Sequence, residues 1–423
     1  MKEDFLHHIW QYQLFNTKDL QTTQGEALSI EKTGYYNQHS GPDFQQAQLT
    51  INTQRWAGHV EIHLKSSDWY AHNHEQDDHY NNVILHVVWE DDIPVFRPNK
   101  EPISTLELKG LVSQHLLQTY NTLTGQANTH PTCAPYITDV NSFAIDKWLE
   151  RLYISRLEQK TQGLNSILNS INNDWEYMLF ILLARYFGLQ RNGECFQQMA
   201  LHINYNIIQK ERHHPLHLEA LFMGVTGLLK DNTSAYARQL NDIYKYLAHK
   251  YDLKPANISA DYYRLRPPNF PTIRLSQLAE LYTQKTNIFS QIISEDYTTI
   301  HKHLQTRTST YWQTHYVFDK THNKRLKKTS ASFIDLLIIN VVIPLRFAYQ
   351  HYMGNPDFNS ITSLLEAIKP EQNHITKTFK TLGINTENAL HSQALITLNN
   401  EFCLPKNCLQ CAIGLKILKN RPS

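Results

Sequence analysis

Cysteine is scarce in this chain, and the sequence also lacks the usual marks of a secreted or membrane protein. Five cysteines in 423 residues cannot form the dense disulfide framework of a small extracellular fold. The first residues lack the basic and apolar regions of a signal peptide. The longest apolar run, residues 333–345, is interrupted by Asp335, Asn340 and Pro344 and is shorter than the roughly 20 residues that a membrane span needs. We therefore expect a soluble, cytoplasmic protein with no membrane partner.

The chain has almost no net charge. Lysine and arginine number 40 and aspartate and glutamate 39, which gives a formal charge of +1. No overall basic field therefore draws the protein towards nucleic acid. A local exception is the segment 302–328, where Asp319 is the single acid among seven lysines and arginines. This basic segment could be a solvated loop or a contact surface for DNA or RNA.

The chain is long enough for two or three domains. Helical spacing of apolar residues from Glu3 to Phe15 is followed by strand-like segments at 27–32, 45–51 and 58–65, and by a buried type of strand at 83–89. From about residue 141 onward the apolar spacing is helical. We therefore predict an α+β fold, with an α/β sheet domain over residues 1–125. A large all-α domain over residues 140–423 would follow and would carry the carboxy-terminal cysteines.

The strand predicted at 58–65 has the most informative pattern, because apolar and polar residues alternate strictly along it. Glu61, His63 and Lys65 would share the face opposite the core. Asp43 lies just before the preceding strand. Two carboxylates on adjacent strands can hold magnesium and leave room for a water and a phosphate oxygen. His63 could then act as a base, or Lys65 could stabilise developing charge.

This arrangement resembles the core of the PD-(D/E)XK phosphodiesterase superfamily, which has the restriction-endonuclease-like fold. The resemblance implies magnesium ligands at Asp43, at the start of the second core strand, and at Glu61, on the third. The superfamily places a lysine two residues beyond the acid, but His63 stands at that position here and the lysine follows at Lys65. The resemblance therefore implies a magnesium-dependent nuclease in which Lys65, or His63 in its place, activates water.

The RecB-like branch of that superfamily also carries Gln-x-x-x-Tyr on a helix after the lysine. Gln76 and Tyr80 have this spacing, and on a helix they would share one face. The resemblance implies that both contact nucleic acid.

Three arginines surround a proline-rich loop at residues 265–271. Arg264, Arg266 and Arg274 could receive phosphate through bidentate contacts. Arginines beside a rigid loop could equally cap carbonyl groups or pair with carboxylates.

Histidine supports a different interpretation of the same region. Six metal-ligating or acidic residues fall within 24 positions: His63, His72, His74, Asp77, His79 and His86. Imidazoles at His72 and His74 with a nearby carboxylate could bind zinc or manganese. The protein would then be a histidine-based metal hydrolase that acts on a small substrate. His86 lies in an apolar strand and could instead be a core residue.

Three of the five cysteines, Cys403, Cys408 and Cys411, lie within nine residues near the end of the sequence. The Cys-x-x-Cys spacing of the last two suits two thiolates on one metal, and Cys133 is the natural fourth ligand. Such a site would attach the terminal segment to the first domain. Zinc, an iron–sulfur cluster and four metal-free thiols all remain open. The order of one early and three late cysteines is similar to AddB-like nucleases, which implies an iron–sulfur cluster, although the spacing differs.

Taken end to end, the chain resembles an uncharacterised bacterial family, domain-of-unknown-function family 2851. The resemblance is carried by Ser40–Phe44, Gly58–His63, Ser67–Tyr70, Asn82–Trp89, Arg264–Pro271 and the terminal cysteines. The family has no established activity, so the resemblance does not decide the function. The residues favour a magnesium-dependent nuclease, with a non-catalytic nucleic-acid- or protein-binding scaffold and the histidine-based hydrolase as alternatives.

Overall fold

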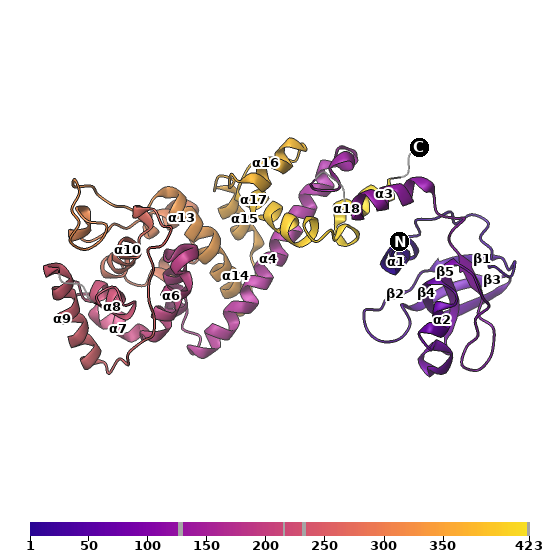
Figure 1. The fold of residues 1–423 in the computed structure, drawn as a ribbon, viewed down its shortest axis with the longest axis horizontal. Coiled ribbons are helices and arrows are strands. Elements are labelled where there is room, and N and C mark those ends of the chain that lie inside the picture. Colours follow the sequence, from indigo (N-terminus) through magenta and orange to yellow (C-terminus); the bar gives the residue numbers. More distant parts are fainter. Residues whose placement is uncertain (126–129, 215, 231–233, 421–423) are drawn as a thin grey trace. The chain divides into compact units, whose positions relative to one another are not determined.

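The computed structural model describes residues 1–125, 130–214, 216–230 and 234–420. A curled sheet in the first part of the chain is followed by a mostly helical part, as Figure 1 shows, so the α+β prediction is confirmed. The chain divides into two compact units. Unit 1 comprises residues 1–149, 378–384 and 396–423, and unit 2 comprises residues 150–377 and 385–395. The terminal cysteines therefore group with the sheet rather than with the helices of unit 2.

The sheet of unit 1 has six strands in the described part of the chain. These are β1 (Leu28–Lys32), β2 (Tyr35–Tyr36), β3 (Phe44–Ile51), β4 (Gln54–Lys65), β5 (Val83–Glu90) and β6 (Thr105–Glu107). Their order is β1-β3-β4-β5-β6, and β2 pairs with β3. The pairs β1–β3 and β3–β4 are antiparallel, whereas β4–β5 and β5–β6 are parallel. A parallel pair needs a crossover connection. Between β4 and β5 this crossover contains α2 (Asp68–Ala71) and two 3-10 turns, His74–Gln76 and Asp78–Tyr80.

Helix α1 (Glu3–Gln11) forms where the apolar spacing predicts a helix, although it ends before Phe15. Its apolar face is fully buried, and the ring of Phe5 stacks on Tyr120 of α3 (Gln114–Thr124) with centroids 3.7 Å apart. Helix α18 (Ala412–Lys419) lies beside α3, as Figure 1 shows. Unit 1 therefore has a helical layer that draws on both the early and the late parts of the chain.

Strand β4 corrects the predicted alternation. Glu61 is only 5% exposed and His63 only 1%, although their face was expected to be a polar surface in water. The crossover covers this face: Trp69 of α2 meets His86 with ring centroids 5.4 Å apart, and His74 lies 5.3 Å from His63. Alternation fixes the direction in which side chains point but not what packs over them. Both faces of β4 are therefore buried where the candidate residues lie.

The helical prediction beyond residue 141 is confirmed. The helices are α4 (Ser142–Ser170), which begins in unit 1, α5 (Trp175–Phe187), α6 (Leu189–His202), α7 (Tyr205–Glu211), α8 (His217–Val225), α9 (Ala235–Lys250), α10 (Pro271–Gln284), α11 (Ile288–Ile292), α12 (Tyr297–Leu304), α13 (Ala331–Leu337), α14 (Ile343–Tyr352), α15 (Phe358–Glu366), α16 (His374–Thr381) and α17 (Ala389–Thr397). Helices α8 and α9 approach closely at Gly224, where an added Cβ would lie 2.2 Å from the ring of Tyr244.

The apolar run around residues 333–345 lies within a continuous helical segment, Ala331–Tyr352. A π-helical turn at Ile338–Val342 precedes Pro344, which stands in the first turn of α14. Proline is tolerated there because the main-chain N–H that it lacks is not needed in a first turn. By length and composition alone this segment could cross a membrane, but 67% of its most apolar window is buried inside the protein. A buried core helix passes the same test, so this is weak evidence for a membrane span.

Candidate metal centre

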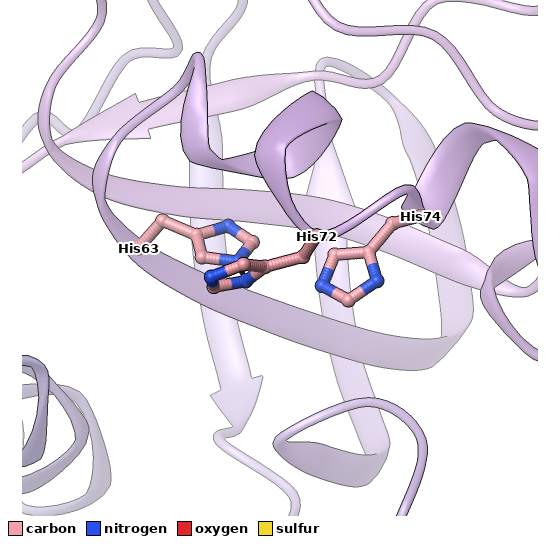
Figure 2. Close-up of side chains that lie close together, drawn as sticks. All are labelled: His63, His72 and His74. Carbon is pink, nitrogen blue, oxygen red and sulfur yellow. Dashed lines mark hydrogen bonds between the residues drawn. The ribbon is translucent and has the colours of Figure 1, made fainter.

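Three histidines from two elements of unit 1 meet beside the sheet. His63 lies on β4, whereas His72 and His74 belong to the crossover that follows α2. Asn73 stands between the latter two with a left-handed backbone (φ 60°), a conformation that asparagine adopts more readily than most residues. The resulting turn directs His72 and His74 to the same side, and Figure 2 shows their rings close to that of His63.

The distances in this group suit a single bound ion. One ring nitrogen from each of the three histidines lies within 4.8 Å of the others. His63 Nε2 is 3.1 Å from His72 Nδ1. Glu61 Oε1 is 3.2 Å from His74 Nε2 and 3.7 Å from His63 Nε2. Two ligands that each lie about 2.0–2.1 Å from a tetrahedral ion are about 3.3–3.4 Å apart. The three imidazoles therefore lie close enough to share one ion, and the Glu61 carboxylate contacts two of them.

A fourth histidine, His86, orients His63 from behind. It lies on β5, is completely buried, and its Nε2 is 2.8 Å from His63 Nδ1. If His63 donates from Nδ1, its Nε2 keeps a lone pair that points towards the other ligands. Metal-binding histidines are usually oriented by such a hydrogen bond on the second ring nitrogen. His86 is therefore placed as a supporting residue rather than as a ligand.

Burial favours the neutral form of His63, His74 and His86, and the neutral imidazole is the form that binds metal. Burial and the neighbouring rings of His86, His74 and His72 lower the pKa of His63 to about 2. Burial also lowers the pKa of His86 to about 3 and lowers that of His74. Glu61 shifts in the opposite sense, because burial and the charge of Asp43 raise its pKa to about 9. A cation would favour the ionised carboxylate that burial alone disfavours.

Asp43 and Glu61 lie next to each other, as the sequence predicts for two acids on neighbouring strands. Each carboxylate accepts a main-chain N–H beside the other: Asp43 donates to Glu61 Oε2, and Ile62 donates to Asp43 Oδ2, both at 3.0 Å. His7 of α1 adds a contact from Nε2 to Asp43 Oδ2 at 3.2 Å. Burial alone would lower the pKa of His7, but the hydrogen bond and charge of Asp43 outweigh it and the pKa is raised. Asp43 therefore links the buried carboxyl group of Glu61 to the imidazole of His7.

Sequence reasoning did not identify His7. It lies in a helix that precedes the whole sheet, and only the packing of α1 against β4 brings it to Asp43. The spacing of apolar residues in α1 predicts which side of the helix is buried, but it does not predict a partner for His7. The one available signal was that a histidine stood on a helix that had to cover the sheet.

Lys65 does not share the environment of Glu61. It lies at the exposed end of β4, where its main-chain N–H donates to the carboxylate of Asp68 at 3.0 Å. His63 instead occupies the position beside the acid. The structure thus places the imidazole, and not the lysine ammonium, next to the two carboxylates.

The prediction that Gln76 and Tyr80 share one helix is wrong. These residues belong to two separate 3-10 turns, and Asp77 between them is extended. Gln76 is exposed and donates to Glu75. Tyr80 is buried and stacks on His74 with ring centroids 3.8 Å apart. The Asp77 side chain accepts the main-chain N–H of residue 79 and so caps the second turn. Because a new turn begins at this point, Gln76 and Tyr80 lie in separate turns.

The arginines near the proline-rich loop do not share one environment. Arg264 and Arg266 are exposed, whereas Arg274 is buried in α10. The guanidinium of Arg274 donates to Asn269 and Gln277 and lies over the ring of Phe333 at 3.6 Å. Arg274 is therefore held by two side-chain amides and an aromatic ring, and phosphate binding by the arginines stays a prediction.

The basic segment 302–328 is partly folded around one of its lysines. Lys327 is buried, donates to the carbonyl groups of Trp312 and His315, and lies 3.9 Å from the ring of Tyr316. Burial lowers the pKa of Lys327 to about 8. At least this charge faces inward, so the segment is not simply a solvated loop.

The structure brings Cys133, Cys403, Cys408 and Cys411 together. All four line one pocket of unit 1, and none forms a disulfide. The grouping expected from the spacing of these cysteines is therefore observed. The residues that line its pocket include none of the histidines described above.

Comparison with known proteins gives a family but no activity. A family model described as "Protein of unknown function (DUF2851)" matches residues 3–374. The chain belongs to this family. No curated protein and no solved structure matches it. The matched part of this DUF2851 protein contains the histidines, Asp43, Glu61 and Cys133, but it ends before the three late cysteines.

Proposed function

We propose that this protein is a metal-dependent hydrolase whose ion is held by His63, His72, His74 and Glu61. The observation that carries the proposal is the set of separations of 3.1, 3.2 and 3.7 Å among these four side chains. Three imidazoles and one carboxylate form a ligand set suited to zinc or manganese. Such an ion, when bound, lowers the pKa of a coordinated water towards 7 and so supplies a nucleophile at neutral pH.

The chain supplies its own groups for the proton transfers. His72 is exposed, so this side of the centre is open to water and substrate. His7 and Asp43 form a pair whose raised imidazole pKa favours the protonated ring near neutral pH. A protonated imidazole within reach of the centre can give its proton to a leaving oxygen. We therefore assign His7 the role of general acid, with Asp43 holding its ring.

A phosphodiester is the substrate class that the surroundings of the centre favour. Helix α1, strands β1, β2, β3 and β4, helix α2 and strand β5 follow one another along the chain, which is one short strand more than the helix, three strands, helix and strand of the resemblance. Asp43 immediately precedes β3 and Glu61 is on β4, the positions that the PD-(D/E)XK resemblance assigns to the two acids. DNA or RNA is therefore the first substrate to test.

A second candidate uses the carboxylates alone. Magnesium takes oxygen ligands, so it would bind at Asp43 and Glu61 and leave the imidazoles uncoordinated. The adjacency of these two carboxylates favours this nuclease. The two candidates differ in which ion they need and in whether His72 matters.

Hydrolysis assays with a generic phosphodiester, single- and double-stranded DNA, and RNA test the proposal. Each would be run with zinc, manganese or magnesium. His72→Ala removes an exposed ligand without disturbing a core, and we expect it to lower both bound metal and hydrolysis by more than about 100-fold, a larger effect than loss of a supporting residue. Lys65→Ala is the matched control on an exposed neighbour and should stay within about twofold of the unmodified protein.

The possible outcomes are distinct. Magnesium-dependent cleavage that survives His72→Ala but is lost in Glu61→Gln would select the second candidate. If the unmodified protein hydrolyses no substrate with any of the three ions and binds none of them, the enzyme proposal is wrong and a binding scaffold remains.

A further inference from the structure

A second cluster of metal-ligating side chains lies elsewhere in unit 1. Cys133 precedes the 3-10 helix Ala134–Asp139, whereas Cys403 ends the π-helical turn Leu398–Cys403. Cys408 and Cys411 flank a single turn that leads into α18. These segments are more than 260 positions apart in the sequence, yet their four cysteine side chains line one pocket. The remaining cysteine, Cys195, lies in α6 of unit 2.

The rest of the cavity wall offers few competing polar partners. It is formed mainly by apolar residues, which include Phe379, Leu398, Phe402 and Ile413. Cys408 and Cys411 are buried, and burial raises the pKa of each of the four thiols. Four thiols gathered in an apolar space would be inert as they stand. Bound metal changes this balance, because it deprotonates a coordinating thiol.

The main chain is tightly packed around the late cysteines. Cys411 immediately precedes α18, and its side chain forms no capping hydrogen bond to the helix. A Cβ added at Gly414 would lie 2.1 Å from the carbonyl oxygen of Cys408, so only glycine lets α18 begin this close to the turn. The close approach of α18 to the turn thus keeps Cys408 and Cys411 near each other.

Contacts outside the cavity hold Cys133 against the late segment. His130 bonds to Asn399 at 2.7 Å, and the ammonium of Lys406 donates to the carbonyl of Gly125 at 2.7 Å. Thr132 lies 3.5 Å from the sulfur of Cys408. These polar contacts hold the segment around Cys133 next to the segment that carries Cys403, Cys408 and Cys411.

We infer that Cys133, Cys403, Cys408 and Cys411 ligate one metal centre with four thiolate ligands, and that it is of the iron–sulfur type. The convergence of the four cysteine side chains on one mainly apolar pocket carries the inference. The kind of metal follows from spacing. In the described part of the chain, three ligand atoms lie within 4.8 Å of one another at the histidines and not at the cysteines. Sulfurs on one tetrahedral zinc would be about 3.8 Å apart, whereas cluster thiolates bind separate irons and lie farther apart.

The experiment measures metal on the full-length protein purified without oxygen. We expect iron and acid-labile sulfide in a fixed ratio to protein, with visible charge-transfer absorption. Cys133→Ala should lose most of this iron, whereas Cys195→Ala, the matched control in unit 2, should keep all of it. Zinc at one per chain that is lost in Cys133→Ala would support the four-thiolate centre and overturn its iron–sulfur type.

A second measurement covers the case in which Cys133→Ala does not fold. Alkylation of the native, unmodified protein should spare Cys133, Cys403, Cys408 and Cys411 until the metal is removed by a chelator. A protein without iron or zinc in stoichiometric amount overturns the inference, as does a folded Cys133→Ala protein that keeps its metal. The result is separable from the hydrolase proposal, because His72→Ala should retain the iron fully.

Discussion

The two clusters of unit 1 are built in different ways. The histidine–carboxylate group comes from one strand, its neighbour and the crossover between them, with the α1 residue His7 as the exception. The cysteine group joins residue 133 to residues 403–411 across the whole of unit 2 in the sequence. Local strand geometry fixes the first group. The second group forms only when the segment around Cys133 meets the late segment, so its formation depends on the folding of unit 1.

The electrostatic settings also differ. Carboxyl oxygens of Glu61 and Asp43 lie beside imidazoles, and His72 opens this group to solvent. The cysteine pocket is mainly apolar and offers few ligand atoms besides sulfur. Oxygen and nitrogen ligands near water suit an ion that activates water, whereas sulfur in an apolar site suits a structural or redox centre. The comparison therefore favours a catalytic role for the histidine–carboxylate group and a structural or redox role for the cysteine group.

After His72→Ala, the largest effect that separates the two clusters should come from His86→Leu. This change removes the hydrogen-bond partner of His63 while it keeps an apolar side chain in the core. We expect zinc or manganese to bind 10–100-fold more weakly, the usual cost of losing a supporting partner. Competition with a metal-sensitive dye measures this affinity. His79→Ala, an exposed residue of the same crossover, is the control, and equal affinity in both variants would contradict the role of His86.

A smaller effect, confined to the other cluster, should come from Gly414→Ala. The new methyl group would meet the Cys408 carbonyl, so the turn must shift. We expect the free energy of unfolding of unit 1 to fall by about 1–3 kcal/mol, with reduced metal at the cysteines and unchanged hydrolysis. Urea unfolding together with metal analysis would show both. Gly110→Ala, where an added Cβ meets open space, is the matched control. Equal stability of the two variants would contradict the close contact.

The most specific effect should be a pH dependence of the metal-free protein. Because folding raises the pKa of Glu61 to about 9, its contribution to stability is lost as the pH rises from about 4.5 to 9. Because folding lowers the pKa of His63 to about 2 and that of His86 to about 3, their contribution is lost as the pH falls below about 6.5. Stability should therefore be greatest near pH 6.5.

Thermal unfolding at several pH values tests this profile. Between pH 6.5 and 9 the melting temperature of the metal-free protein should fall, and Glu61→Gln should remove that fall. Added zinc should do the same, because the ion favours the ionised carboxylate. A melting temperature that rises across this range in the metal-free protein would show that Glu61 is not held in its neutral form.

Sequence patterns predicted the parts of unit 1 that depend on local spacing. Helix α1, strands β1, β3, β4 and β5, and the adjacency of Asp43 and Glu61 all follow from periodicity and from strand order. The clustering of His63, His72 and His74 was predicted as one alternative, and their proximity is observed. The roles of these residues stay predictions.

The failures share one physical cause, which is that spacing does not show what covers a surface. The buried state of Glu61 and His63 depends on the crossover, and the arrival of His7 depends on the packing of α1. Gln76 and Tyr80 were expected on a helix, but Asp77 accepts a main-chain N–H and starts a new turn between them. The sequence showed Lys327 only as one charge in a basic segment, whereas in the structure its ammonium group donates to main-chain carbonyl groups. Each outcome depends on contacts between residues that the linear pattern treats separately.

The discontinuity of unit 1 has a consequence for the order of events during synthesis. Residues 396–420 complete this unit, and a ribosome reaches them only after it has made all of unit 2 as far as residue 395. A nascent chain at that stage holds the sheet and Cys133 but not Cys403, Cys408, Cys411 or α18. The centre proposed at the cysteines can therefore be completed only after these residues are translated, whereas all residues of the histidine group, up to His86, are made much earlier.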